Sequence, residues 1–218
     1  MTSERPLRSE REDVSRIGRA LLEKDLTRAS GGNVSARNGD RIAVSPSGIP
    51  YEDVTPGDVP VTDLDGALLD GEHEPSSETP MHTRIYAARE NVGGIVHSHS
   101  PYASTFASLG EPIPASHSLI AFAGKEVPVA GYEPPGSEAL ADLAVDALGQ
   151  EHDACLLQNH GVMAVGEDAD AALETAEMVE FVAQVHYQAS AIGEPVIMDD
   201  DDLEYLVDMF GSYRNQSK

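Results

Sequence analysis

The stretch IVHSHSPYA, Ile95 to Ala103, runs from apolar residues into a proline and indicates a buried strand that leads directly into a helix. On a strand, alternate residues point to the same face of the sheet, so His97 and His99 would project together. Two adjacent imidazoles could bind a metal ion, but they would also fit the polar face of a half-exposed strand. Because burying two unpaired imidazoles is costly, the metal hypothesis requires further ligands elsewhere in the chain.

Signals for strands and helices alternate on both sides of this stretch. Upstream, the sequence predicts a helix over residues 9–26, hairpins around Asn38-Gly39 and Asp65-Gly66, and a helix that begins with Thr79 as its cap and Pro80 in its first turn. Downstream, it predicts a helix capped by Ser137, two buried strands joined by a turn at Asn159–Gly161, a long helix over residues 168–193 and a helical acidic tail. This order favours a single α/β domain over residues 1–218, with a central, largely antiparallel sheet flanked by helices.

The composition is that of a protein with a substantial core. Of 218 residues, 40% are hydrophobic, and no apolar run approaches the length needed to span a membrane. The N-terminal segment is charged and lacks the apolar core of a secretory signal. Cys155 is the single cysteine and is interpreted as a small core residue, so no intramolecular disulfide is possible. These features predict a soluble cytoplasmic protein.

The charge is strongly negative. There are 38 acidic and 14 basic residues, which give a formal net charge of −24 and argue against a nucleic-acid partner, since phosphate binding needs clustered lysine and arginine. An acidic surface can simply serve solubility. It is also typical of adaptation to concentrated salt, which screens the repulsion between carboxylates. We therefore expect a halophilic protein that loses structure and activity when salt is removed.

Further candidate ligands for a metal occur in two other motifs. His160 follows the apolar run ACLLQN, and Glu78 lies in EPSSETPMH, where a loop enters a helix. Three histidines and one carboxylate are appropriate ligands for zinc, with Mn²⁺ or Co²⁺ as possible replacements. Four of the remaining histidines are interpreted as surface or packing residues: His73, His82, His152 and His186. His117 is left undecided.

Three short segments rich in serine and glycine lie near these candidates in the sequence. They are SGGNVS (Ser30–Ser35), SPSG (Ser45–Gly48) and PSSE (Pro75–Glu78). Each segment alone fits an ordinary turn. Together, and with one of them containing Glu78, they indicate a phosphate site built from backbone N–H groups and hydroxyls. A divalent metal beside them would supply the positive potential that an anionic substrate needs near so acidic a protein.

Five motifs in this order carry a resemblance to a known family: SGGNVSAR, VSPSGIPYEDVTP, PSSETPMHTRIYAAR, IVHSHSPYAS and LLQNHGVMAVG. The chain resembles the class II aldolase/adducin family, and within it the fuculose-phosphate aldolase branch. The resemblance implies a three-layer sandwich and a cyclic homotetramer with active sites between subunits. It assigns the metal to Glu78, His97, His99 and His160, with Glu78 also as catalytic base. The implied phosphate-binding residues are Asn33, Ser47, Gly48, Ser76 and Ser77.

The activity implied by the resemblance is zinc-dependent and reversible. A ketose 1-phosphate similar to L-fuculose 1-phosphate would be cleaved to dihydroxyacetone phosphate and an aldehyde such as L-lactaldehyde. One family tyrosine, thought to protonate the aldehyde oxygen, is replaced here by Ser118, and a second family tyrosine matches Tyr213. This departure leaves alternatives open: a pentulose-5-phosphate 4-epimerase, a methylthioribulose-1-phosphate dehydratase, or a non-catalytic interaction module of the adducin kind.

Overall fold

A computed structural model describes the backbone of residues 6–216 and the side chains up to residue 211. Within this part of the chain, eight strands form one sheet in the order β4-β3-β2-β1-β5-β8-β7-β6. All neighbouring strands pair antiparallel except β6 and β7, which are parallel. The strands are β1 (Asn33–Asn38), β2 (Arg41–Val44), β3 (Val61–Asp63), β4 (Leu68–Asp70), β5 (Gly94–Ser98), β6 (Val129–Ala130), β7 (Ala154–Leu157) and β8 (Gly161–Gly166).

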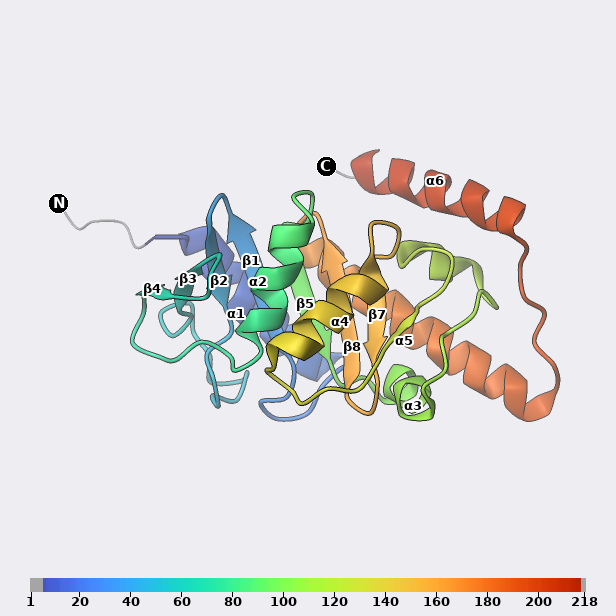
Figure 1. The fold of residues 1–218 in the computed structure, drawn as a ribbon, viewed down its shortest axis with the longest axis horizontal. Helices are drawn as coiled ribbons and strands as arrows, with labels where there is room; N and C mark the ends of the chain where they lie inside the picture. Colours follow the sequence, from blue (N-terminus) through green and yellow to red (C-terminus); the bar gives the residue numbers. More distant parts are fainter. Residues whose placement is uncertain (1–5, 217–218) are drawn as a thin grey trace.

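Helices cover both faces of this sheet. They are α1 (Arg8–Glu23), α2 (Thr79–Ala88), α3 (Pro101–Leu109), the 3₁₀ helix η1 (Ser118–Phe122), α4 (Glu138–Leu148), α5 (Ala169–Ile192) and α6 (Asp200–Gln216). In Figure 1, α2 and α4 lie in front of the sheet, and α1 and α5 lie behind it. Two separate hydrophobic cores match these layers, because one joins the sheet to α1, α3 and α5 and the other joins it to α2 and α4. The predicted antiparallel α/β sandwich is confirmed.

Strand β5 lies near the middle of the sheet, between β1 and β8. Its side chains alternate between the two cores: Ile95 packs with α2 and α4, whereas Val96 packs on the opposite face. All five of its residues are buried, as expected for a strand covered on both sides. The same alternation directs His97 to the face of α2, with Asn33 of β1 and Met163 of β8 as its cross-strand partners.

Two boundaries differ from the sequence expectations. The first hairpin turns at Gly39-Asp40 rather than Asn38-Gly39, since Asn38 still pairs with Arg41. Helix α2 begins at Thr79, which places Glu78 at the N-cap position; the Thr79 hydroxyl donates to the Ser76 carbonyl instead of capping. The Glu78 side chain makes no capping bond and remains available for other contacts.

The C-terminal helix α6 lies apart from the layers at the end of an extended connection (Figure 1). It contacts the region of η1 through the buried Leu203, an ion pair between Glu204 and Lys125, and the rings of Phe122 and Phe210. Among the helices of residues 6–216, none is both long enough and apolar enough to cross a membrane.

Candidate metal centre and active site

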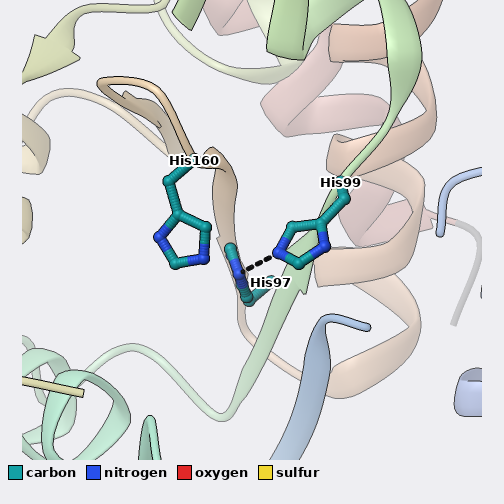
Figure 2. A group of neighbouring side chains, drawn as sticks. All are labelled: His97, His99 and His160. Atoms are coloured by element: carbon teal, nitrogen blue, oxygen red, sulfur yellow. Dashed lines mark hydrogen bonds between the residues drawn. The ribbon is translucent and has the colours of Figure 1, made fainter. Parts of the chain in front are cut away.

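Three histidines converge where the central strand β5 ends and the strand β8 begins. His97 lies on β5, His99 follows the end of that strand, and His160 lies in the turn between β7 and β8. Their imidazole rings point toward one another, as Figure 2 shows, and one nitrogen from each lies within 4.8 Å of the others. The Nε2 atoms of His97 and His99 are 3.0 Å apart. The two histidines of the His-Ser-His motif therefore lie together, although only His97 belongs to the strand.

His97 is fully buried, and its hydrogen bonding selects one tautomer. Its Nδ1 donates to the carbonyl of Val162 at 2.8 Å, which leaves the Nε2 lone pair directed at the other two histidines. Burial is the main cause that lowers the pKa of His97 well below its ordinary value, and the proximity of His99 and His160 adds to the effect. Burial likewise lowers the pKa of His99. Neutral imidazoles with a free ring nitrogen are the form that binds metals.

Glu78 approaches the same point from the N-terminus of α2. Its Oε2 lies 3.2 Å from His97 Nε2, and its Oε1 lies 3.5 Å from His160 Nε2. The Asn33 amide donates to Oε2 at 2.7 Å. Oε1 is buried and has no hydrogen-bond partner among the described residues. The carboxylate thus has one oxygen held in place and the other free to accept a metal or a proton.

This donor set fits a divalent metal ion. In a tetrahedral zinc site with bonds near 2.0–2.1 Å, neighbouring ligand atoms are about 3.3 Å apart. The two distances from Glu78 and the distance between His97 and His99 lie close to that value. Three imidazole nitrogens within 4.8 Å of one another and a carboxylate near two of them, with one buried oxygen that lacks a hydrogen-bond partner, form a donor set that could hold a metal ion.

The backbone around the histidines leaves no room for additional side-chain atoms. A Cβ added to Gly161 would lie 2.3 Å from the Ser98 carbonyl oxygen and 2.9 Å from the His99 ring. Residue 161 follows His160 directly and opens β8. Glycine at this position lets the turn that carries His160 pack against the end of β5.

The histidine cluster borders a cavity of about 240 Å³, whose lining includes His99, His160 and residues of the segments 30–33, 45–51 and 76–78. The polar residues among its lining include Ser30, Asn33, Ser45, Ser47, Ser76, Ser77, Glu78, His99 and His160, and Gly48 also lines it. Two of these loops are paired, since the Ser76 amide donates to the Ser45 carbonyl and the Ser47 amide donates to Glu74. The described lining contains no lysine or arginine. The structure therefore brings all five predicted phosphate-binding residues to one wall beside the predicted ligands.

Two residues near the site were missed in the sequence. Tyr51 is buried, and its hydroxyl bonds to the Gly32 carbonyl and to Ser45, both at 3.1 Å, so it ties two cavity loops together. His82 was interpreted as a surface or packing residue, but it is fully buried and bonds to Asn33. Its spacing of four residues from Glu78 on a helix was the signal that could have indicated this position.

The residues expected on the aldehyde side are not brought to this cavity within the described part of the chain. Ser118 begins η1, next to His117, whose ring lies against Phe181 of α5. Tyr213 falls on α6, and its side chain lies outside the described residues. The assignment of Tyr213 stays a prediction.

Residues 12–187 match the family described as Class II Aldolase and Adducin N-terminal domain. The chain belongs to the class II aldolase and adducin family. It is 42% identical over 212 residues to 5-deoxy-D-ribulose 1-phosphate aldolase of Bacillus thuringiensis, covering 96% of this chain and 99% of that one. It is 35% identical to 5-methylthioribulose-1-phosphate/5-deoxyribulose-1-phosphate aldolase of Rhodospirillum rubrum, covering 92% and 90% of the two chains.

Structural similarity leads to the same family. A solved structure of L-fuculose 1-phosphate aldolase superposes with a TM-score of 0.90 at 37% identity, covering 93% of this chain and 96% of that chain. The L-fuculose phosphate aldolase of Escherichia coli K12 is 34% identical over 86% of this chain and 87% of its own. The family and these relatives identify the chain as an enzyme, a lyase of the class II aldolase type that acts in carbohydrate metabolism. Enzymes of this class are typically metal-dependent, and the histidine cluster could hold the metal.

Proposed function

We propose that this protein cleaves a ketose 1-phosphate reversibly to dihydroxyacetone phosphate and an aldehyde, with zinc bound by Glu78, His97, His99 and His160. One observation carries the proposal: the Glu78 carboxylate lies against His97 and His160 of the histidine cluster and belongs to the lining of a cavity rich in serine and glycine. That arrangement combines a metal ligand set, a proton carrier and an anion-binding wall within one small space. A purely structural metal site would need only the first of these.

The cavity residues account for substrate binding without basic side chains. Ser47, Ser76 and Ser77 would hold the phosphate through their hydroxyls, Gly48 through its backbone amide, and Asn33 through the second N–H of its side-chain amide, since the Ser47 and Ser76 amides already donate to backbone carbonyls. Gly48 has a positive φ of 73° and open space where a Cβ would lie, so the backbone is accessible at this position. Binding energy from the phosphate would thus position the reacting carbons a few bonds away.

The chemistry at the reacting carbons would use Glu78. A divalent metal, when bound, would act as a Lewis acid on the substrate's carbonyl and neighbouring hydroxyl oxygens. In the cleavage direction, the hydroxyl on the departing carbon would give its proton to solvent and that carbon would become the aldehyde carbon, while the electron pair of the broken carbon–carbon bond stays with the ketone fragment. Glu78 would return a proton to that carbon, and in the synthetic direction it would remove the same proton.

The relatives favour a substrate with a terminal methyl or thiomethyl group. We propose 5-deoxyribulose 1-phosphate first, because the relative that is 42% identical bears that name and is matched over nearly its whole length. Its cleavage to dihydroxyacetone phosphate leaves acetaldehyde by atom balance. L-Fuculose 1-phosphate, which would give L-lactaldehyde, is the second candidate and is supported by the structural neighbour.

The test is dihydroxyacetone phosphate release from both ketose phosphates. Zinc-loaded protein in molar KCl would be assayed beside a chelator-treated sample and a substrate that lacks the phosphate. We expect metal-dependent release, with the faster substrate identifying the aldehyde. No release by folded, zinc-loaded protein would contradict the proposal and would favour the epimerase or dehydratase alternatives.

We further propose that the protein is a single domain that forms a homotetramer in the cytoplasm. Helix α5 exposes Phe181, Tyr187 and Ile192, with relative exposures of 42%, 50% and 91%. Large exposed apolar side chains along one helix support burial against another subunit. Light scattering on the purified protein would test the number of subunits.

A further inference from the structure

A column of polar side chains lies buried between β1 and α2 and extends from the cavity residues Asn33 and Glu78 into the protein interior. Glu78 is the N-cap residue of α2, and His82 and Tyr86 lie inside the helix. Because the three are spaced by four residues, they lie along one face of it. Asn33 and Ser35 alternate on β1 and point toward the same helix. All five residues are buried, and His82 and Ser35 have no exposed surface. We call these five residues the polar column.

The side chains of the polar column interlock in one continuous series of contacts. Asn33 Nδ2 donates to Glu78 Oε2 at 2.7 Å, and Asn33 Oδ1 contacts His82 Nε2. The other ring nitrogen of His82, Nδ1, lies 2.6 Å from Ser35 Oγ. Ser35 Oγ lies 2.8 Å from the hydroxyl of Tyr86. The candidate base at one end is thus connected to a buried tyrosine two helical turns away.

The chemistry of each group fixes the direction of every bond. An ionised Glu78 only accepts, so the Asn33 amide must present its NH₂ to Glu78 and its oxygen to His82. His82 must then donate from Nε2, and its neutral ring must accept at Nδ1 from the Ser35 hydroxyl. Ser35 in turn accepts from Tyr86. With Glu78 ionised, the donors of His82, Ser35 and Tyr86 and one N–H of the Asn33 amide are used, and the reverse direction would leave the Asn33 oxygen facing the carboxylate.

The surroundings keep His82 in the neutral form that this arrangement needs. Its neighbours in α2, Met81 and Ile85, belong to the apolar core between helix and sheet. Burial lowers the pKa of His82 to about 3. Burial also raises the pKa of Tyr86 above its ordinary value, so the phenol keeps its proton.

We propose that His82 is a positioning residue for the aldolase reaction: it locks the Asn33 amide so that Glu78 Oε2 is held and the carboxylate keeps its place against the histidine cluster, with Oε1 left without a hydrogen bond. The inference rests on the proposed role of Glu78 as base. If His82 could not donate, the amide could turn its oxygen toward the carboxylate, and repulsion would move Glu78 away from its working position. His82 touches neither the substrate cavity nor the histidine cluster among the described contacts.

The first test needs no activity. Nitrogen-15 NMR of histidine-labelled, metal-free protein would report which ring nitrogen of His82 carries the proton, with the signal assigned by its loss in His82→Gln. We expect a neutral ring protonated at Nε2 from about pH 5 to about pH 8, where an ordinary histidine titrates. A ring protonated at Nδ1, or one that gains a second proton within that range, would overturn the proposal.

The second test isolates proton transfer by following exchange of the dihydroxyacetone phosphate proton with D₂O in the absence of aldehyde. His82→Phe should slow exchange by about 10–100-fold, the usual effect of losing a group that orients a metal-site residue. The rate is compared per bound metal and at saturating dihydroxyacetone phosphate, because Glu78 is also a proposed metal ligand and Asn33 a proposed phosphate-binding residue. His82→Gln, which keeps an N–H donor near the position of Nε2, should recover most of the rate. An unchanged rate in His82→Phe would overturn the proposal.

Two further variants are controls. One distinguishes a positioning role of His82 from a general loss of stability, and the other tests the proposed role of Glu78 independently of His82. Ile85→Ala removes a buried side chain from the same helix without touching the polar column, so it should lower Tm but leave exchange per bound metal unaltered. Equal losses of exchange in Ile85→Ala and His82→Phe would show a merely structural role. Glu78→Gln tests the base itself: exchange at the wild-type rate in that variant would contradict the proposed function, whatever the tautomer of His82.

Discussion

The hydrogen bonding of His97 leaves one of its ring nitrogens available to bind a metal. Its Nδ1 is used by the Val162 carbonyl, so Nε2 is the nitrogen left for a ligand. We expect His97→Ala to lose the bound metal, as measured by elemental analysis after gel filtration. His73→Ala is a matched control, because His73 lies on the surface beside Asp58 and should keep full metal content. Unchanged metal stoichiometry in His97→Ala would refute its assignment.

The buried neutral ring of His82 should make stability depend on pH. In the unfolded chain this histidine binds a proton below about pH 6.5, whereas in the folded protein its pKa is lowered to about 3. The unfolded state therefore binds more protons between these values, and stability should fall as the pH is lowered, by up to about 1.4 kcal/mol per pH unit from this residue. Urea unfolding of metal-free protein at several pH values would measure the slope. The slope should be shallower in His82→Gln, and identical slopes would contradict the prediction.

Single residues were predictable where a short motif carried them. His97, His99, His160 and Glu78 come from recognisable motifs, and the structure brings all four together. The contacts of His82 were harder to predict, because its spacing of four residues from Glu78 places both on one helical face but does not show which element that face meets. Only the three-dimensional pairing of α2 with β1 shows that it faces inward.

At the scale of elements, the turn between β7 and β8 decides where His160 lies. Gly161→Ala would push a methyl group against the Ser98 carbonyl and the His99 ring. We expect a loss of about 1–3 kcal/mol or more in stability, since neither a strand backbone nor a packed ring can move easily, together with weaker metal binding. Urea unfolding and metal titration would measure both effects. Gly193→Ala is the control, since Gly193 has an extended backbone and open space around it; equal stability of the two variants would contradict the account.

The elements were predictable to the extent that local signals controlled them. The Ser137 cap of α4 and the two hairpins are present in the structure, and the turn predicted at Asn159–Gly161 lies one residue earlier, since Gly161 already pairs with Leu157. The predicted boundaries of strands and helices were wrong where contacts between distant parts of the chain set them. Asn38 stays in β1 because it pairs with Arg41, and Glu78 takes the N-cap position because the Ser76 carbonyl binds both the amide and the hydroxyl of Thr79. The order of strands in the sheet depends on contacts that no local pattern encodes.

For the whole molecule, charge is the dominant property. A formal net charge of −24 on 218 residues produces self-repulsion that salt screens. We expect Tm to rise by several degrees between very low and molar KCl, as measured by circular dichroism. Sucrose at equal osmolality is the control, because it does not screen charge and should reproduce little of the increase. The same Tm at both salt concentrations would contradict the prediction of halophilic behaviour.

The central claim is that Glu78 acts as the base beside a bound metal. The most direct measurement compares dihydroxyacetone phosphate release by wild-type protein and Glu78→Gln, with metal content determined in the same samples. The account predicts that the variant keeps some metal through the three histidines but loses at least about 10²–10⁴-fold in turnover per bound metal, the usual contribution of a positioned acid or base. Near-wild-type turnover per bound metal in Glu78→Gln would contradict it.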